Sequence, residues 1–186
     1  MGTKFSTRIW VGVVGIASIF WGSKGYADTV VSVADFGLKP DTRENAVAYV
    51  QKAIEACRGK EPVTLVFPEG RYDFWPQYAH EKNYYETNTY DVFPKRLAML
   101  FEGFHNITVD GNGSQFVMHD RIQPITVENC DGVTLKNFSI DWDIPLTAQA
   151  RVIKVGSDFF EIEINVLESP YIIEDGKLVF VGEGWK

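Results

Sequence analysis

The fold is decided by two stretches of sequence, LFEGFHNITVDG at 100–111 and TVENCDGVTLKN at 126–137, which align at an offset of 26 residues. Apolar positions coincide in the alignment, as Phe101 and Val127 show, and glycine exchanges with asparagine at the turns. These two residue types best tolerate left-handed backbone. Each copy has the pattern of two short strands around a tight turn, and so small a unit buries its apolar side only when copies stack. The repeat therefore predicts a parallel β-helix.

The sequence before the repeat predicts strands at 30–33 and 63–67 with one helix between them. Asp41 and Glu44 have the spacing of a capping box ahead of the helix. Apolar residues then recur at helical spacing, and Gly59 suits the helix end. The apolar stripe consists of Ala46, Val47, Val50, Ala53, Ile54 and Cys57. We expect this stripe to lie on the end of the coil stack, so the fold class is all-β with one N-terminal capping helix.

The period of the repeat fails after Asp143, where a different pattern of strands begins. Short apolar segments at 151–155, 159–164 and 178–181 are separated by turn residues, including Asp175-Gly176. This pattern is typical of antiparallel hairpins. We therefore expect three parts: an export segment at 1–27, a cap with the first coils at 28–146, and the start of an inserted antiparallel β module at 147–186.

Residues 1–27 have the features of a secretory signal peptide. Lys4 and Arg8 precede an apolar run at 9–21, and Gly25-Tyr26-Ala27 follows it. The run is shorter than the about 20 residues of a membrane span, so cleavage near Ala27 is preferred to an uncleaved anchor. We expect an exported protein, periplasmic or extracellular, with no stable membrane insertion after cleavage.

Charge and residue counts exclude several classes of partner and cofactor. The 159 residues after the signal carry 15 basic and 25 acidic groups, which disfavours nucleic acid as a partner. Two cysteines are no disulfide framework, and free thiols are preferred to a bridge between Cys57 and Cys130. The three histidines lack the spacing of metal ligands. We expect neither a metal nor another cofactor.

Several spaced segments resemble the entry of the pectate-lyase superfamily of right-handed β-helices. They are VADFG (33–37), DT (41–42), QKAIEA (51–56) and LVFPEGRY (65–72). Further segments look like glycoside hydrolase family 110: YDFWP (72–76), the loop to Thr87-Asn88, NITVDG (106–111) and FSIDWD (138–143). In that family, a right-handed β-helix carries a β-barrel module inserted after the early coils, which the hairpins after Asp143 would fit.

The resemblance to family 110 implies an exo-acting, inverting, metal-independent α-galactosidase. Its substrates would be glycans ending in α-1,3-linked galactose, of blood group B or linear type. The family is much longer than this chain, and its catalytic aspartates are expected on later coils. We therefore expect the chain to be a truncated N-terminal fragment that is insoluble or inactive alone.

Glycoside hydrolysis needs two carboxyl groups, and Asp141 and Asp143 alternate on one strand so that both face the same way. They are weak catalytic candidates, with a substrate clamp or a solvated strand face as alternatives. Arg121 lies one coil earlier, where a constant offset would bring it near these aspartates. Arginine and aspartate together suit recognition of sugar hydroxyls, and the alternative, an ordinary surface ion-pair cluster, is the more common reason for such a pattern.

Residues 72–93 hold eight aromatics among polar residues, which suits stacking on the apolar face of galactose. The alternative is a loop that packs its aromatics onto the coil. Our candidates for substrate binding here are Trp75, Tyr78 and His80, together with Arg121 and Asp143. Two other functions stay open: a pectin-degrading polygalacturonase or lyase, which the acidic charge disfavours, and a non-enzymatic β-helix adhesin, which leaves the aromatic loop unexplained.

Overall fold

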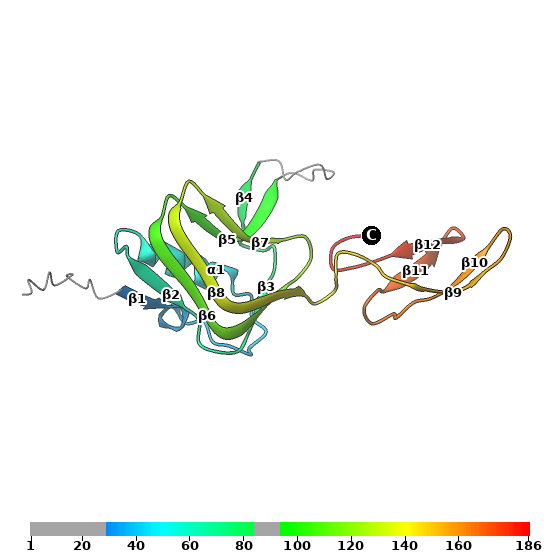
Figure 1. Ribbon diagram of the computed structural model, residues 1–186, viewed down its shortest axis with the longest axis horizontal. Helices are drawn as coiled ribbons and strands as arrows, with labels where there is room; N and C mark the ends of the chain where they lie inside the picture. Colours follow the sequence, from blue (N-terminus) through cyan, green and yellow to red (C-terminus); the bar gives the residue numbers. More distant parts are fainter. Residues whose placement is uncertain (1–28, 84–93) are drawn as a thin grey trace, which may run out of the picture.

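The computed structural model of the chain describes residues 29–83 and 94–186 (Figure 1). The export segment predicted at 1–27 lies outside the described residues, as do Tyr84, Tyr85, Tyr90 and Phe93 of the aromatic loop. In chain order the elements are β1 (Thr29–Ser32), the 3-10 helix η1 (Val33–Phe36), α1 (Val47–Cys57), β2 (Val63–Val66), β3 (Arg71–Phe74), β4 (His80–Lys82), β5 (Lys95–Glu102), β6 (His105–Met118), β7 (Gln123–Glu128), β8 (Asp131–Trp142), β9 (Arg151–Val155), β10 (Phe160–Glu163), β11 (Tyr171–Glu174) and β12 (Lys177–Phe180).

The two copies of the repeat pair in parallel with each other. β5 pairs with β7, and the first half of β6 pairs with the first half of β8, both at the predicted offset of 26 residues. Phe101 therefore lies beside Val127, and Ile107 lies beside Val133. β1 and β2 precede them in the same parallel sheet, in the order β1-β2-β6-β8. Parallel stacking of the copies is confirmed, and the right-handed β-helix that would continue it stays a prediction.

The register between β6 and β8 changes after Asp110, from an offset of 26 to one of 24. The cause is a corner of unequal length, because β6 holds three residues, 111–113, between its paired segments and β8 holds one. The constant offset expected from the sequence is therefore wrong beyond the corner. It would set Val117 opposite Asp143, whereas the backbone N–H of Asp143 donates to Met118, which brings His119 opposite Asp143.

Left-handed backbone is found at five of the six glycine and asparagine turn positions in the repeat. Their φ angles lie between 51° and 71°, at Gly103, Asn106, Asn129, Gly132 and Asn137. Gly111 is the exception, and close approach explains it instead. A Cβ atom on Gly111 would lie 2.5 Å from Cβ of Phe138 and 2.7 Å from the carbonyl oxygen of Asn137. The turn chemistry expected from the sequence is thus confirmed, apart from this one position.

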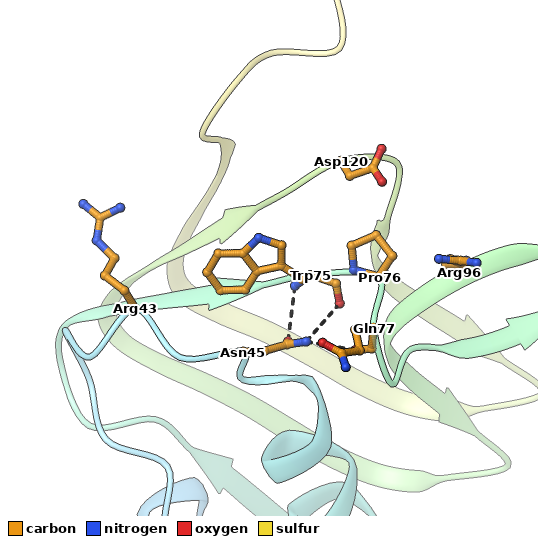
Figure 2. Close-up of a pocket in the computed structure, with 7 residues that line it drawn as sticks. All are labelled: Arg43, Asn45, Trp75, Pro76, Gln77, Arg96 and Asp120. Carbon is orange, nitrogen blue, oxygen red and sulfur yellow. Dashed lines mark hydrogen bonds between the residues drawn. The ribbon is translucent and has the colours of Figure 1, made fainter. Parts of the chain in front are cut away.

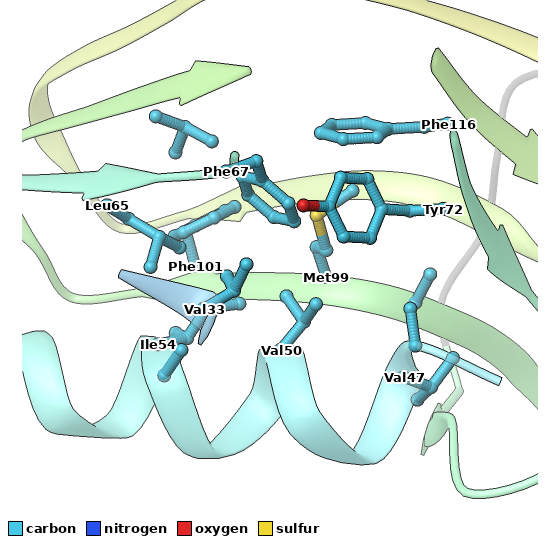
Figure 3. Packing of buried hydrophobic residues seen from close by; sticks show 14 of the residues in the cluster. Val33, Val47, Val50, Ile54, Leu65, Phe67, Tyr72, Met99, Phe101 and Phe116 are labelled. Carbon is cyan, nitrogen blue, oxygen red and sulfur yellow. The ribbon is translucent and has the colours of Figure 1, made fainter. Parts of the chain in front are cut away.

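The hydrophobic core lies between the parallel sheet, the β5-β7 sheet and α1. Figure 3 shows α1 directing Val47, Val50 and Ile54 towards Phe67 and Phe101. All six residues of the predicted apolar stripe are buried, which confirms the orientation of the helix. Burial of Val47, Val50 and Ile54 contributes about 1.5–3 kcal/mol each, so this face holds the helix in place.

The start of α1 differs from the prediction. The capping box of Asp41 and Glu44 does not form, because Asp41 adopts a left-handed φ of 62° and accepts a hydrogen bond from the backbone N–H of Arg71. Instead, the side-chain oxygen of Asn45 accepts a hydrogen bond of 3.1 Å from the backbone N–H of Val47, the first helical residue. This contact satisfies one of the unpaired N–H groups at the helix start.

The apolar residues of the second copy are far less covered than those of the first. Phe101, Val109 and Phe116 are fully buried, whereas the residues beside them in β7 and β8 are 46%, 41% and 37% exposed. These neighbours are Val127, Leu135 and Ile140. The first copy is covered by the second, and within the described residues no third layer covers the second.

Residues 151–180 form two antiparallel hairpins, β9-β10 and β11-β12. Asp175 and Gly176 have φ angles of 51° and 72°, as expected for a two-residue turn between β11 and β12. The hairpin prediction is confirmed, although β11 itself was not predicted. We call residues 147–186 the hairpin module. In the described part of the chain, no helix has the length and apolar content required to cross a membrane.

Cys57 and Cys130 are both free, as the sequence predicts. Cys57 is buried on α1, and its burial raises the pKa of the thiol to about 11. Cys130 is half-buried at the repeat turn, where its sulfur accepts a hydrogen bond from the backbone N–H of Phe104.

Candidate functional site

The candidate site begins where β3, β6 and β8 end on one rung of the sheet. The residues that follow these three strand ends are Trp75, His119 and Asp143. The backbone N–H groups of His119 and Asp143 continue the parallel pairing by donating to Phe74 and Met118. Three polar or aromatic side chains from separate parts of the sequence are thereby brought side by side.

Two residues before Trp75, strand β3 places the carboxylate of Asp73 in the protein interior. Strand alternation directs Tyr72 and Phe74 into the core, so Arg71 and Asp73 lie on the opposite face. The side chain of Asp73 is fully buried, and Arg71 donates to both its oxygens, with Nη2 at 2.6 Å and Nε at 3.0 Å. Burial would raise the pKa of this carboxyl, but hydrogen bonds from Arg71 and His119 outweigh it and lower the pKa below its ordinary value.

Arg71 joins Asp73 to the next strand. Its Nη2 atom also lies 2.8 Å from Oδ1 of Asp143, and hydrogen bonding to Asp73 is the main cause that raises the pKa of Arg71 further. Arg43 lies 3.8 Å from Asp73 and 3.7 Å from Asp143, so two arginines face two carboxylates. The side chain of Asp143 is 40% exposed, which places it at the solvent edge of this cluster.

His119 occupies the centre of the site and is 3% exposed. Its Nε2 lies 2.9 Å from Oδ1 of Asp73, and its Nδ1 lies 2.9 Å from both carboxylate oxygens of Glu183. The indole of Trp75 stacks on the imidazole, with ring centroids 3.8 Å apart and planes 10° apart. Glu183 comes from the hairpin module, so this histidine connects the module to the coil sheet.

A pocket of about 510 Å³ opens beside the stacked rings (Figure 2). Its lining residues are Arg43, Asn45, Trp75, Pro76, Gln77, Arg96 and Asp120. Asn45 fixes the floor of the pocket, because its side-chain oxygen accepts from the backbone N–H of Trp75 and its amide donates 2.9 Å to the carbonyl of Gln77. The same asparagine caps α1, so the helix start and the pocket floor share one anchor.

The structure brings together only part of the predicted site. Trp75 lines the pocket, and Asp143 belongs to the adjoining ion-pair cluster. Tyr78 is 64% exposed and His80 lies exposed on β4, and neither is among the residues that line the pocket. The roles of these residues in substrate binding stay predictions.

The two remaining candidates are also not among the residues that line the pocket. Asp141 is exposed, and its carboxylate accepts a hydrogen bond from the backbone N–H of Trp142. Arg121 is exposed, and among the described residues it forms an ion pair with neither Asp141 nor Asp143.

Five residues of the cluster escaped the sequence reasoning: Arg43, Arg71, Asp73, His119 and Glu183. Alternation around Tyr72 and Phe74 was a usable signal for Arg71 and Asp73, because it marks two charged residues on one face of a buried strand. The contact of Glu183 with His119 spans 64 residues, and the sequence offers no periodicity that would predict it.

His119, Asp143 and Glu183 also bring possible metal-ligand atoms within 4.8 Å of one another. These atoms already have partners, since Asp143 is paired with Arg71 and the imidazole with Asp73 and Glu183. A cation would have to displace a guanidinium from Asp143. The donor set therefore suits an ion-pair network better than a metal.

Comparison with known proteins places the chain in a family. Residues 148–186 match the family described as GLAA-B beta-barrel domain I. The chain is 61% identical over 160 residues to alpha-1,3-galactosidase B of Bacteroides thetaiotaomicron, covering 86% of the chain and 26% of that protein. It is 38% identical over 157 residues to alpha-1,3-galactosidase A of Shewanella woodyi, covering 84% of the chain and 26% of the relative.

A third relative is alpha-1,3-galactosidase B of Phocaeicola vulgatus, 35% identical over 181 residues, which covers 95% of the chain and 28% of that protein. The chain thus spans about a quarter of the length of these relatives. Over that quarter, the chain belongs to the family of the alpha-1,3-galactosidases, glycoside hydrolase family 110.

Proposed function

We propose that the chain is part of an exported α-galactosidase that removes terminal α-1,3-linked galactose from glycans, by an inverting reaction that needs no metal. Relatives named alpha-1,3-galactosidase support the reaction class. The pocket beside Trp75 is the observation that supports a role for this region in substrate binding. Its volume falls in the range of about 300–1,000 Å³ that is typical of ligand sites.

The lining of the pocket has the chemistry that a sugar requires. Trp75 and Pro76 supply an apolar surface for the C–H face of galactose, and His119 already covers one face of the indole, so a sugar would stack on the other. The side chains of Gln77, Asp120 and Arg43 supply donors and acceptors for hydroxyl groups. The pocket is thus proposed to hold part of the galactosyl substrate.

The same proposal includes the architecture. The exposed apolar residues of β7 and β8 would be covered if further coils continued the stack into a right-handed β-helix. The two hairpins would be the first strands of a β-barrel, because a lone two-stranded hairpin is marginally stable in water. Residues 28–146 would then form the cap and first coils, and residues 147–186 the start of the inserted module.

The catalytic carboxyl pair is proposed to lie in another part of the full-length protein. Asp143 is paired with Arg71 at 2.8 Å, and Asp141 is exposed and accepts from the backbone N–H of Trp142, so neither lies in the apolar surroundings that suit a general acid. Asp143 is better suited to hold Arg71 and Arg43 beside the pocket.

Export by cleavage near Ala27 is a separate part of the proposal, and N-terminal sequencing of the secreted protein tests it.

The experiment that tests the reaction uses the full-length protein with α-1,3-galactobiose and, separately, polygalacturonate, each with and without EDTA. We expect free galactose from the first substrate alone, undiminished by EDTA, and proton NMR should show the β-anomer forming first. Shortened or unsaturated uronides would instead identify a pectin-degrading enzyme. No release from either substrate would contradict the enzyme and favour a β-helix adhesin.

A further inference from the structure

We propose that Glu183 and His119 are positioning residues for the Trp75 platform, so that docking of the hairpin module and sugar binding in the pocket are coupled. The carboxylate of Glu183 fixes the imidazole, and the imidazole fixes the plane of the indole. The proposal rests on the function proposed for the pocket, but its first test needs no sugar.

The imidazole of His119 is held from both sides. Each ring nitrogen lies 2.9 Å from a carboxylate oxygen, of Asp73 on one side and Glu183 on the other. An ionised carboxylate can only accept, so a ring nitrogen that carries a proton donates to the carboxylate facing it. Rotation of the ring would break at least one charge-assisted hydrogen bond in a nearly dry site, which makes the ring plane well defined.

Trp75 takes its orientation from this ring. Its backbone is fixed by Asn45, but among the described residues the indole itself has no hydrogen-bond partner and is oriented by the stack on His119 at 3.8 Å and 10°. Offset or parallel stacking of two aromatic rings at this distance favours one orientation of the indole over others. The plane on which a sugar would lie is therefore set by the histidine.

Glu183 brings the hairpin module into this arrangement. The residue follows β12, and besides His119 it accepts a hydrogen bond of 3.3 Å from the backbone N–H of Asp120, which lines the pocket. Trp142 Nε1 donates to the carbonyl of the same Asp120. One carboxylate of the module thus contacts both the imidazole on which Trp75 stacks and a second residue that lines the pocket.

The first test is fluorescence of the full-length protein. An imidazole stacked on an indole quenches its emission, so Glu183→Ala, which frees the imidazole, and His119→Gln, which removes it, should brighten the emission of Trp75. The rise should vanish in a Trp75→Phe background, which separates it from the other tryptophans. Glu183→Gln keeps an oxygen that accepts from Nδ1 and should restore most of the quenching. Glu168→Ala and His105→Gln, at exposed sites away from the pocket, are the matched controls and should change nothing.

The second test is binding of α-1,3-galactobiose, measured by calorimetry. We expect Glu183→Ala to weaken binding about fivefold to tenfold, within the usual range for coupled sites, with rescue by Glu183→Gln. Unchanged Trp75 emission in both Glu183→Ala and His119→Gln overturns the inference. The inference is also overturned if Glu183→Ala binds the disaccharide with unchanged affinity while Trp75→Ala loses binding. In that case the function proposed for the pocket still stands. If Trp75→Ala binds normally, the proposed pocket function fails, and the fluorescence result still decides whether Glu183 and His119 orient Trp75.

Discussion

Replacing Asp73 by asparagine tests the ion-pair cluster more directly than any other change. The carboxylate is fully buried and accepts from Arg71 while contacting His119. Removing one member of a buried ion pair costs about 3–5 kcal/mol, because the remaining charge is left without its partner. Here Arg71 keeps Asp143 at 2.8 Å and His119 keeps Glu183, so neither is orphaned. We therefore expect about 3 kcal/mol, at the lower end of that range.

Amide hydrogen exchange of the full-length protein measures this loss where it occurs. A cost of about 3 kcal/mol should speed exchange in β3 and at the end of β6 roughly a hundredfold, since each 1.4 kcal/mol is a factor of ten. The control is Asp141→Asn, which lies two strands away in the same register row but is exposed, and should change stability by less than about 0.5 kcal/mol. Equal exchange in the two variants would refute the assignment of Asp73 as the buried centre of the cluster.

Three further outcomes follow from the same contacts. The lowered pKa of Asp73 means that its stabilisation is complete above its unfolded pKa of about 4 and is lost as pH falls through the folded value, so Asp73→Asn should flatten the acid limb of a melting profile. The raised pKa of the Cys57 thiol means that the free energy of unfolding should fall as pH rises from about 9. Iodoacetamide at pH 8 should modify the half-buried Cys130 before the buried Cys57, and the reverse order by mass spectrometry would contradict the burial of Cys57. Gly111→Ala should cost more than about 2 kcal/mol by overpacking against Phe138, whereas Gly103→Ala, with open space around it, should cost less in the same denaturation assay.

Local patterns predicted the parts of the fold that local physics determines. The helical stripe from Ala46 to Cys57 and the strand pairing of Phe101 with Val127 follow from periodicity, and both are confirmed. The cap of α1 was wrong because Asp41 is recruited by the distant backbone of Arg71, and no local signal reveals that competition.

The candidate site was harder to predict because its members meet through register rather than through sequence. His119 and Asp143 become neighbours only because the corner of β6 is two residues longer than that of β8. Trp75 was identified by its chemistry as a stacking residue. Glu183 could not be identified, since a glutamate in a hairpin module has no distinguishing sequence signal until the fold sets it against an imidazole.

The corner at 111–113 has a consequence for how such a coil can vary. Each copy has two sheet segments joined by this bend, and the leading segments pair at one constant offset although the bends of the two copies differ in length. Insertion or loss of residues at the bend therefore slides the trailing segment along its neighbour while the hydrophobic layers before the bend remain undisturbed. A change in the length of the bend thus changes which side chains of the trailing segment reach the pocket edge, without any substitution in the leading strands. Sites of different specificity could arise on one coil scaffold by changes in corner length alone.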